Sequence, residues 1–161
     1  MQGREDIQIQ EEFNIQKVLW FKLGAEDYGI KVDYVLTVID TAPGIPVPNT
    51  PKFVKEVVNL RGTLIPIMNL KELFPISKEE SGEEMMVILD DVDGMRVGIM
   101  VDQVNDVLDI DMGELLPAPP SLSAFGAECI YGIHKFKEKI LVILDIARVV
   151  GIAREMMTKF S

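Results

Sequence analysis

Few side chains of this chain are suited to chemistry. The single histidine, His134, would have to serve any histidine-based metal site or nucleophile–base pair. It lies in the apolar run 130–136, where a packed or solvent-facing imidazole is the ordinary outcome. The single cysteine, Cys129, excludes an internal disulfide and a cysteine-rich zinc site. Its apolar surroundings indicate a buried, inert thiol.

The segment Asp91-Val92-Asp93-Gly94 shares part of the pattern of a calcium-binding loop. If Gly94 takes the sixth position of such a loop, Leu89 is first and Met100 is twelfth, where acidic ligands are required. The segment therefore predicts a hairpin turn and not a calcium site. The glycines are scattered singly, so no phosphate-binding glycine loop is present. We expect no metal, no cofactor and no catalysis.

Arg61 is the charged residue that needs an explanation. It lies between two apolar runs, 54–60 and 63–68, that are typical of half-buried strands. Gly62 can take the positive φ of a tight turn, so the pattern predicts a hairpin that presents Arg61 beside its turn. Two interpretations stay open. The arginine stem covers apolar surface, or the cation is held for a binding partner.

Composition narrows the classes of partner. The 161 residues are 48% hydrophobic, enough for one domain or two small lobes. The formal charge of −10 would repel a nucleic acid and an anionic membrane surface alike. No apolar run approaches the ~18 residues of a membrane span. We expect a soluble, cytoplasmic protein that binds no nucleic acid and does not insert into a membrane.

The chain contains an internal repeat. Gly29–Asp40 matches Gly98–Asp109 at seven of twelve positions without a gap, where chance predicts about one. Each copy follows a strand and a turn, and each precedes a stretch interrupted by proline. A late hairpin comes next, in which Leu64–Leu70 corresponds to Ile140–Ile146. The two halves have the same order of parts, which indicates a duplication.

The repeat predicts an all-β fold with a few short helices, in which two small five-stranded barrels lie in tandem and pack together. Barrels of this size are marginally stable alone, so we expect a shared core or an exchanged segment. Short helical turns are expected at 33–36, 69–74 and 145–150, with Asn69 and Asp145 as caps. The expected divisions are a polar N-terminal tail at 1–14, a first barrel at 15–76, a linker at 77–84, a second barrel at 85–150, and a C-terminal tail at 151–161 with possible helical structure.

Several motifs, spread over most of the chain, point to one family. The most specific is Asn59-Leu60-Arg61-Gly62, followed by Ile65-Pro66-Ile67. Others are Tyr28-Gly29-Ile30, Pro51-Lys52-Phe53-Val54, and Val97-Gly98-Ile99 with Val101-Asp102. On these residues the sequence resembles the CheW family of bacterial chemotaxis adaptors. The same domain type also forms the regulatory end of the histidine kinase CheA, but this chain has no kinase core.

The resemblance implies a non-enzymatic adaptor with the two-barrel fold, together one CheW-like domain, recruited from the cytoplasm to membrane receptor arrays. It implies one contact to the hairpin tip of chemoreceptors and one to the CheA regulatory domain. Because each partner has two barrel ends, these contacts could repeat head to tail and close into rings. An adaptor of the same fold in another receptor–kinase pathway, such as surface motility, is the alternative.

The resemblance also suggests site residues. For the receptor, we expect a groove between the barrels formed by Val35, Val57, Leu64, Met85 and Met86 with Arg61 at its rim, although two methionines entering a strand are more often part of a core. For the kinase, the candidates are Ile30, Val32, Tyr34, Leu115, Leu116 and Leu122, for which ordinary packing is the competing interpretation.

Two departures from the family stand near the motif arginine. Many relatives carry glycine where this chain has Glu56, and some carry an acidic residue where it has Thr37. The acidic residue can hold the motif arginine. Our hypothesis is that Glu56 replaces this missing partner and forms an ion pair with Arg61.

Overall fold

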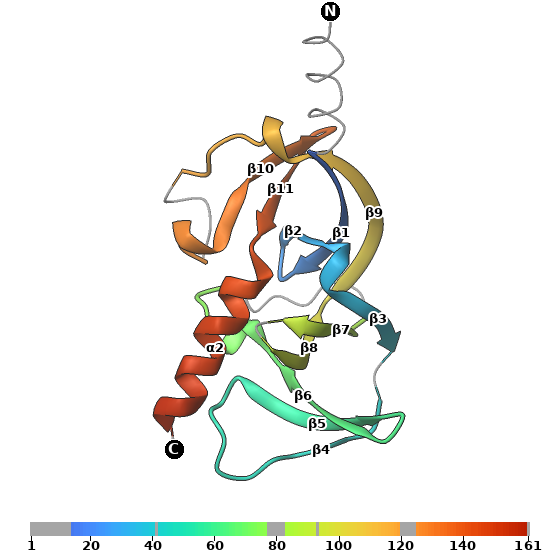
Figure 1. Ribbon diagram of the computed structural model, residues 1–161, viewed down its shortest axis with the longest axis vertical. Coiled ribbons are helices and arrows are strands. Elements are labelled where there is room, and N and C mark those ends of the chain that lie inside the picture. The colour runs from blue at the N-terminus through green and yellow to red at the C-terminus, as the bar shows by residue number, and fades with distance from the viewer. Residues whose placement is uncertain (1–13, 41, 77–82, 93, 120–124, 161) are drawn as a thin grey trace, which may run out of the picture.

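The computed structural model describes residues 14–40, 42–76, 83–92, 94–119 and 125–160. Within these ranges, two sheets and one long helix make up the fold (Figure 1). Sheet 1 has the order β10–β11–β2–β1–β9, with β1 at Ile15–Leu23, β2 at Glu26–Lys31, β9 at Gln103–Asp111, β10 at Ile130–Phe136 and β11 at Lys139–Leu144. Sheet 2 has the order β3–β7–β8–β6–β5–β4, with β3 at Val35–Asp40, β4 at Gly44–Ile45, β5 at Val54–Leu60, β6 at Thr63–Met68, β7 at Met85–Val92 and β8 at Met95–Val101.

The two halves of the chain exchange strands. The hairpin β1–β2 of the first half pairs in parallel with β11 of the second half, and the hairpin β7–β8 pairs in parallel with β6 of the first. The next strands cross over too, because β3 pairs with β7 and β9 pairs with β1. The expected segment exchange is confirmed, and it is reciprocal.

This exchange corrects the expected division at 15–76 and 85–150. The chain passes from one sheet to the other between Lys31 and Val35 and again between Val101 and Gln103, so each sheet contains both halves. Sheet 2 has six strands, and not five, because the two-residue β4 adds to it. Neither half would bury enough apolar surface by itself, and the exchange joins both halves into one folding unit.

Each sheet curls around its own apolar cluster. Val18, Ile110, Leu141 and Ile143 fill the inside of sheet 1, and a second cluster with Ile67 and Ile88 fills sheet 2. Two glycines at matching positions of the repeat allow this close packing. A Cβ atom on Gly29 would lie 2.5 Å from Cγ1 of Val18, and one on Gly98 would lie 2.4 Å from Cδ1 of Ile67.

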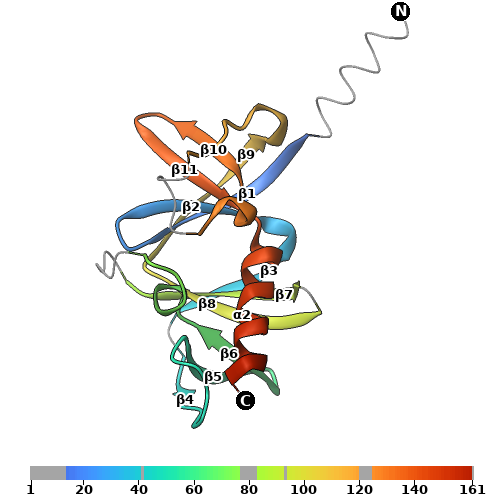
Figure 2. The ribbon, with the colours of Figure 1, turned by 90° about the vertical axis from the view of Figure 1, so that its left-hand side faces the viewer.

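The largest apolar cluster lies between the sheets. It contains Phe21 of sheet 1, Leu89 of sheet 2 and Val149 of the helix α2, all fully buried. The helix spans Ile146–Phe160 and runs from sheet 1 alongside sheet 2 (Figures 1 and 2). It begins as expected after Asp145, whose Oδ1 accepts a hydrogen bond from Arg148 N at 3.4 Å. The last residues therefore continue a helix that starts before the expected tail at 151–161.

Short 3₁₀ helices complete the description: η1 at Val32–Tyr34, η2 at Leu70–Glu72, η3 at Met112–Glu114 and η4 at Ala127–Cys129. Asn69 caps η2 as expected, with its Oδ1 accepting from Lys71 N at 3.1 Å. Beyond η3, Leu116 exchanges two backbone hydrogen bonds with Ile133 of β10. This bridge protects the outer edge of sheet 1. In the described part of the chain, no helix is both long and apolar enough to cross a membrane.

Candidate protein-interaction surface

Arg61 occupies the turn of the β5–β6 hairpin. Its φ of 53° and that of Gly62, 83°, are the two positive values of a type I′ turn. Asn59 supports the turn, because its Oδ1 accepts a hydrogen bond from Gly62 N at 2.9 Å. The sequence predicted a positive φ for Gly62 only. A left-handed conformation at an arginine is strained, so the conformation of Arg61 costs about 1–2 kcal/mol.

The guanidinium of Arg61 is exposed and forms no ion pair with any residue in the described part of the chain. The hypothesis of an ion pair with Glu56 is therefore wrong for this structure. The Glu56 side chain instead lies over β4, where its Cδ is 2.3 Å from the place of a Gly44 Cβ atom. A side chain larger than glycine at position 44 would displace it.

An apolar surface adjoins Arg61. Across the sheet, Ile45 of β4 faces Val57 of β5, and Val57 faces Pro66 of β6. Residues directly opposite one another share a face, and Leu64 shares it with Pro66 because it lies two positions away. Ile45 is 67% exposed and Leu64 64%. We call Ile45, Val57, Leu64 and Pro66 the hairpin patch.

The structure brings together only some of the expected receptor-binding residues. Val57, Arg61 and Leu64 lie on the hairpin, whereas Val35 and Met85 lie at opposite ends of the paired strands β3 and β7 and pack against the shared core. Met86 is 1% exposed inside sheet 2, which excludes it from any contact surface and corrects that expectation. The hairpin patch also contains Ile45, which the sequence did not predict as a contact residue. It is absent from the expected receptor-binding residues, although its β-branched side chain, which is typical of strands, was an available signal.

The expected kinase-binding residues also separate. Ile30 is fully buried in the shared core, so its assignment to a surface is corrected. Val32 and Tyr34 are half-buried in η1, and Leu115 is half-buried against the cluster inside sheet 1. Leu116 is 45% exposed. Leu122 lies outside the described residues.

The sequence and the fold can be compared with those of known proteins. The family model of the CheW-like domain matches residues 17–154. The chain belongs to the CheW-like family. It is 33% identical over 136 residues to the chemotaxis protein CheW of Klebsiella aerogenes, covering 84% of this chain and 82% of that protein. It is 32% identical over 135 residues to CheW of Treponema pallidum, covering 81% and 79%.

A solved structure and a more distant relative extend the comparison. The crystal structure of the scaffolding protein TtCheW from Thermoanaerobacter tengcongensis matches with a TM-score of 0.73 and 31% identity, covering 81% of this chain and 84% of that one. Protein FrzA of Myxococcus xanthus is 22% identical over 142 residues, covering 87% and 88%. The chain thus belongs to a family of non-enzymatic adaptor proteins.

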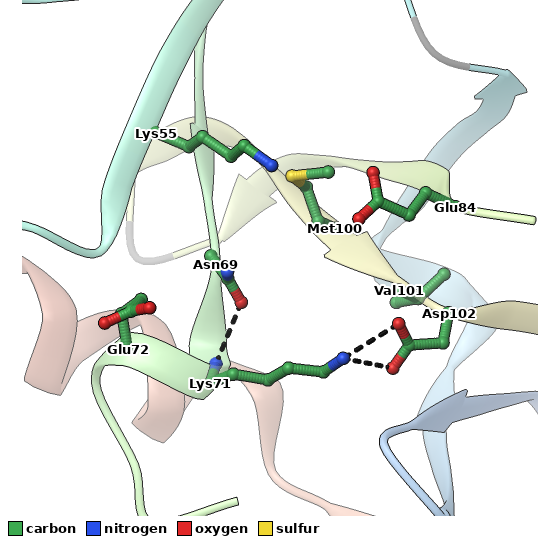
Figure 3. A pocket seen from close by; sticks show the side chains of 8 residues that line it. All are labelled: Lys55, Asn69, Lys71, Glu72, Glu84, Met100, Val101 and Asp102. Carbon is green, nitrogen blue, oxygen red and sulfur yellow. Dashed lines mark hydrogen bonds and ion pairs between the residues drawn. The ribbon is translucent and has the colours of Figure 1, made fainter. Parts of the chain in front are cut away.

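A polar pocket lies where the two sheets meet (Figure 3). Its volume is about 140 Å³, and Lys71 and Asp102 pair with each other within it. Within the residues described, no three His, Cys, Asp or Glu side chains gather as a metal site would require. His134 lies elsewhere, on β10 of sheet 1.

Burial also decides the state of two other ionisable groups. Burial raises the pKa of the Cys129 thiol, with the nearby carboxylates of Glu128 and Asp145 acting in the same direction. Burial likewise raises the pKa of Tyr28, whose hydroxyl donates a hydrogen bond to Glu26. Both groups stay protonated at neutral pH, so neither is poised as a nucleophile.

Proposed function

We propose that this CheW-like protein couples methyl-accepting chemoreceptors to the histidine kinase CheA by binding both. It acts in the cytoplasm at receptor arrays, and it performs no reaction itself. The receptor conformation biases the kinase because the contacts differ between two states, with a coupling of about 1–3 kcal/mol. Family membership and the similarity to TtCheW support this role.

The main structural support for the proposal is the exposed Arg61 next to the hairpin patch. A receptor tip is a helical hairpin, and an amphipathic helix can lay its apolar face on Ile45, Val57 and Leu64. A glutamate at the edge of that face then accepts two parallel hydrogen bonds from the guanidinium. The interpretation of Arg61 as a cation held for a partner thus gains support, because no described acidic side chain neutralises it.

The kinase contact uses a different part of the molecule. Leu116 is exposed at the edge of sheet 1, and the half-buried Val32 and Tyr34 lie in the connection between the sheets. A contact of this kind at one barrel, together with a similar one at the other, allows the adaptor and the kinase domain to alternate in closed rings.

A reconstituted receptor–kinase assay tests the proposal. Arg61→Glu reverses the charge beside the hairpin patch, so we expect weaker receptor binding and loss of kinase activation with an unchanged fold. Lys135→Glu is the matched control, because Lys135 is an exposed cation on β10 of the other sheet. Wild-type receptor binding by Arg61→Glu would refute the proposed site.

The similarity to FrzA supports a second candidate function, which is the same adaptor role in a pathway other than chemotaxis. Recovery of receptors and kinases from the native cell lysate separates the two. A kinase other than CheA in the recovered complex would favour the second candidate.

A further inference from the structure

Asp102 is an exception to the apolar interior. In the ranges that the structure describes, it is the one polar or charged residue that is buried, with 3% exposure. It follows directly after β8 and precedes β9, at the point where the chain passes from sheet 2 to sheet 1. A buried charge without partners is strongly unfavourable, so its contacts decide its role.

The contacts of Asp102 come from both sheets, and Figure 3 shows its pair with Lys71. Its carboxylate pairs with Nζ of Lys71 in two places, at 2.6 Å to Oδ2 and 2.8 Å to Oδ1. Lys71 belongs to η2, which follows β6 of sheet 2. The same carboxylate accepts a hydrogen bond from Gly24 N in the turn between β1 and β2 of sheet 1. The backbone of Asp102 also donates to Lys22 O of sheet 1 at 2.9 Å.

The contacts of Asp102 have a preferred direction, which the apolar contacts of the core do not have. Apolar contacts between the sheets are non-directional, so the core can tolerate small rotations of one sheet against the other. Charge-assisted hydrogen bonds have a preferred geometry and weaken when their angle changes. Lys71 is itself held, since Asn69 fixes its backbone N–H and its side chain is only 11% exposed. The carboxylate therefore joins two well-positioned anchors, one on each sheet.

The repeat shows that this arrangement is one-sided. Asp33 is the counterpart of Asp102 and lies at the other crossing between the sheets. It is exposed and makes no ion pair within the described residues. The late-hairpin correspondence continues by one residue from Lys71 to Ala147, which carries no charge. The ion pair therefore forms at only one of the two crossings.

We infer that the Lys71–Asp102 pair is a lock that fixes the angle between the two sheets. The lock holds at the β8–β9 crossing, and at the β2–β3 crossing Asp33 forms no such ion pair with any described residue. This role concerns the geometry of the adaptor itself and does not depend on which partners it binds.

The test replaces the lock without leaving an unpaired charge. The double variant Lys71→Met with Asp102→Asn removes both charges and keeps an oxygen to accept from Gly24 N. Spin labels at Thr63→Cys in sheet 2 and Lys135→Cys in sheet 1 report the distance between the sheets, because both positions are exposed and the native Cys129 is buried. We expect one narrow distance in the parent and a broadened distribution in the double variant.

The matched control is the exposed pair Lys17–Asp109 within sheet 1, with side chains 68% and 65% exposed. Lys17→Met with Asp109→Asn should leave the distance unchanged. A distribution in the Lys71/Asp102 variant that superimposes on the parent would overturn the inference.

A measurement on the unaltered protein covers the case in which the variant does not fold. The amides of Gly24 and Gly62 both donate to a side-chain oxygen, of Asp102 and Asn59 respectively. If the lock stays closed, the Gly24 amide exchanges hydrogen much more slowly than the exposed Gly62 amide. Equal exchange rates for the two glycines would contradict the lock.

Discussion

Substituting Arg61 by asparagine separates the two interpretations of this residue. Arg61 has a φ of 53° in a type I′ turn, where Asn followed by Gly is the preferred pair. An arginine in the left-handed region costs about 1–2 kcal/mol, and asparagine tolerates that region better. We therefore expect Arg61→Asn to raise the free energy of unfolding by ~0.5–1 kcal/mol.

The same substitution deletes the cation from the surface. If Arg61 pairs with a receptor carboxylate, its loss weakens receptor binding by about 2–5 kcal/mol where the pair is buried in the complex. The experiment combines urea denaturation with a binding titration against a receptor tip fragment. Weaker binding by a more stable variant supports direct contact. Undiminished binding would refute it and leave Arg61 with a packing role.

Three further predictions concern the core. Gly98→Ala should lower the free energy of unfolding by about 1–3 kcal/mol through overpacking. Adding Ile67→Val should restore part of this loss, because Cδ1 of Ile67 lies 2.4 Å from the new Cβ atom. Additive losses of the two substitutions in urea denaturation would contradict this explanation. Asp102→Asn removes the carboxylate from its buried pair with Lys71 and should lower the free energy of unfolding by about 3–5 kcal/mol, whereas Asp33→Asn should change it by no more than ~0.5 kcal/mol. Equal losses for the two would disagree with the difference in burial. Because burial raises the pKa of Cys129, its thiol should resist iodoacetamide at pH 8 until the protein unfolds. The free energy of unfolding should also fall as the pH rises above the ordinary thiol pKa of 9.0, because the unfolded chain releases the thiol proton at a lower pH than the folded protein. Rapid alkylation of the folded protein would contradict this prediction.

The elements of the fold could be predicted from local patterns, but their pairing could not. The turns at Gly24 and Gly94, the caps at Asn69 and Asp145 and the repeat itself are local signals, and each appears in the structure. β6 pairs with β5, and its second neighbour could be a strand of its own half or, as observed, β8 of the other half. The same residues would be buried in both arrangements. Apolar periodicity cannot distinguish these two arrangements, which is why the expected division at residues 77–84 differs from the observed sheets.

The candidate site was predictable where one face of a strand meets solvent. In β6, Leu64 is exposed and Ile65 is buried, as the alternation of a strand requires. In β7 that alternation gives no such guidance. Met86 faces the inside of sheet 2 and Met85 packs on the shared core, so both faces of the strand are covered. The sequence shows that two neighbouring methionines point in opposite directions, but whether either direction leads to solvent depends on the packing of the second layer.

The matching aspartates extend this argument from strands to the duplication. Asp33 and Asp102 occupy equal positions in the repeat, yet one is exposed and the other is buried with a charged partner. The difference arises outside the matching segment, at Lys71 and its uncharged counterpart Ala147. A duplicated sequence therefore predicts equal backbone positions and not equal roles, because the energy of a buried carboxylate is set by the residues that reach it from elsewhere in the chain. Reciprocal exchange makes this divergence possible, since each sheet receives strands from both halves and one crossing can gain an ion pair that the other lacks.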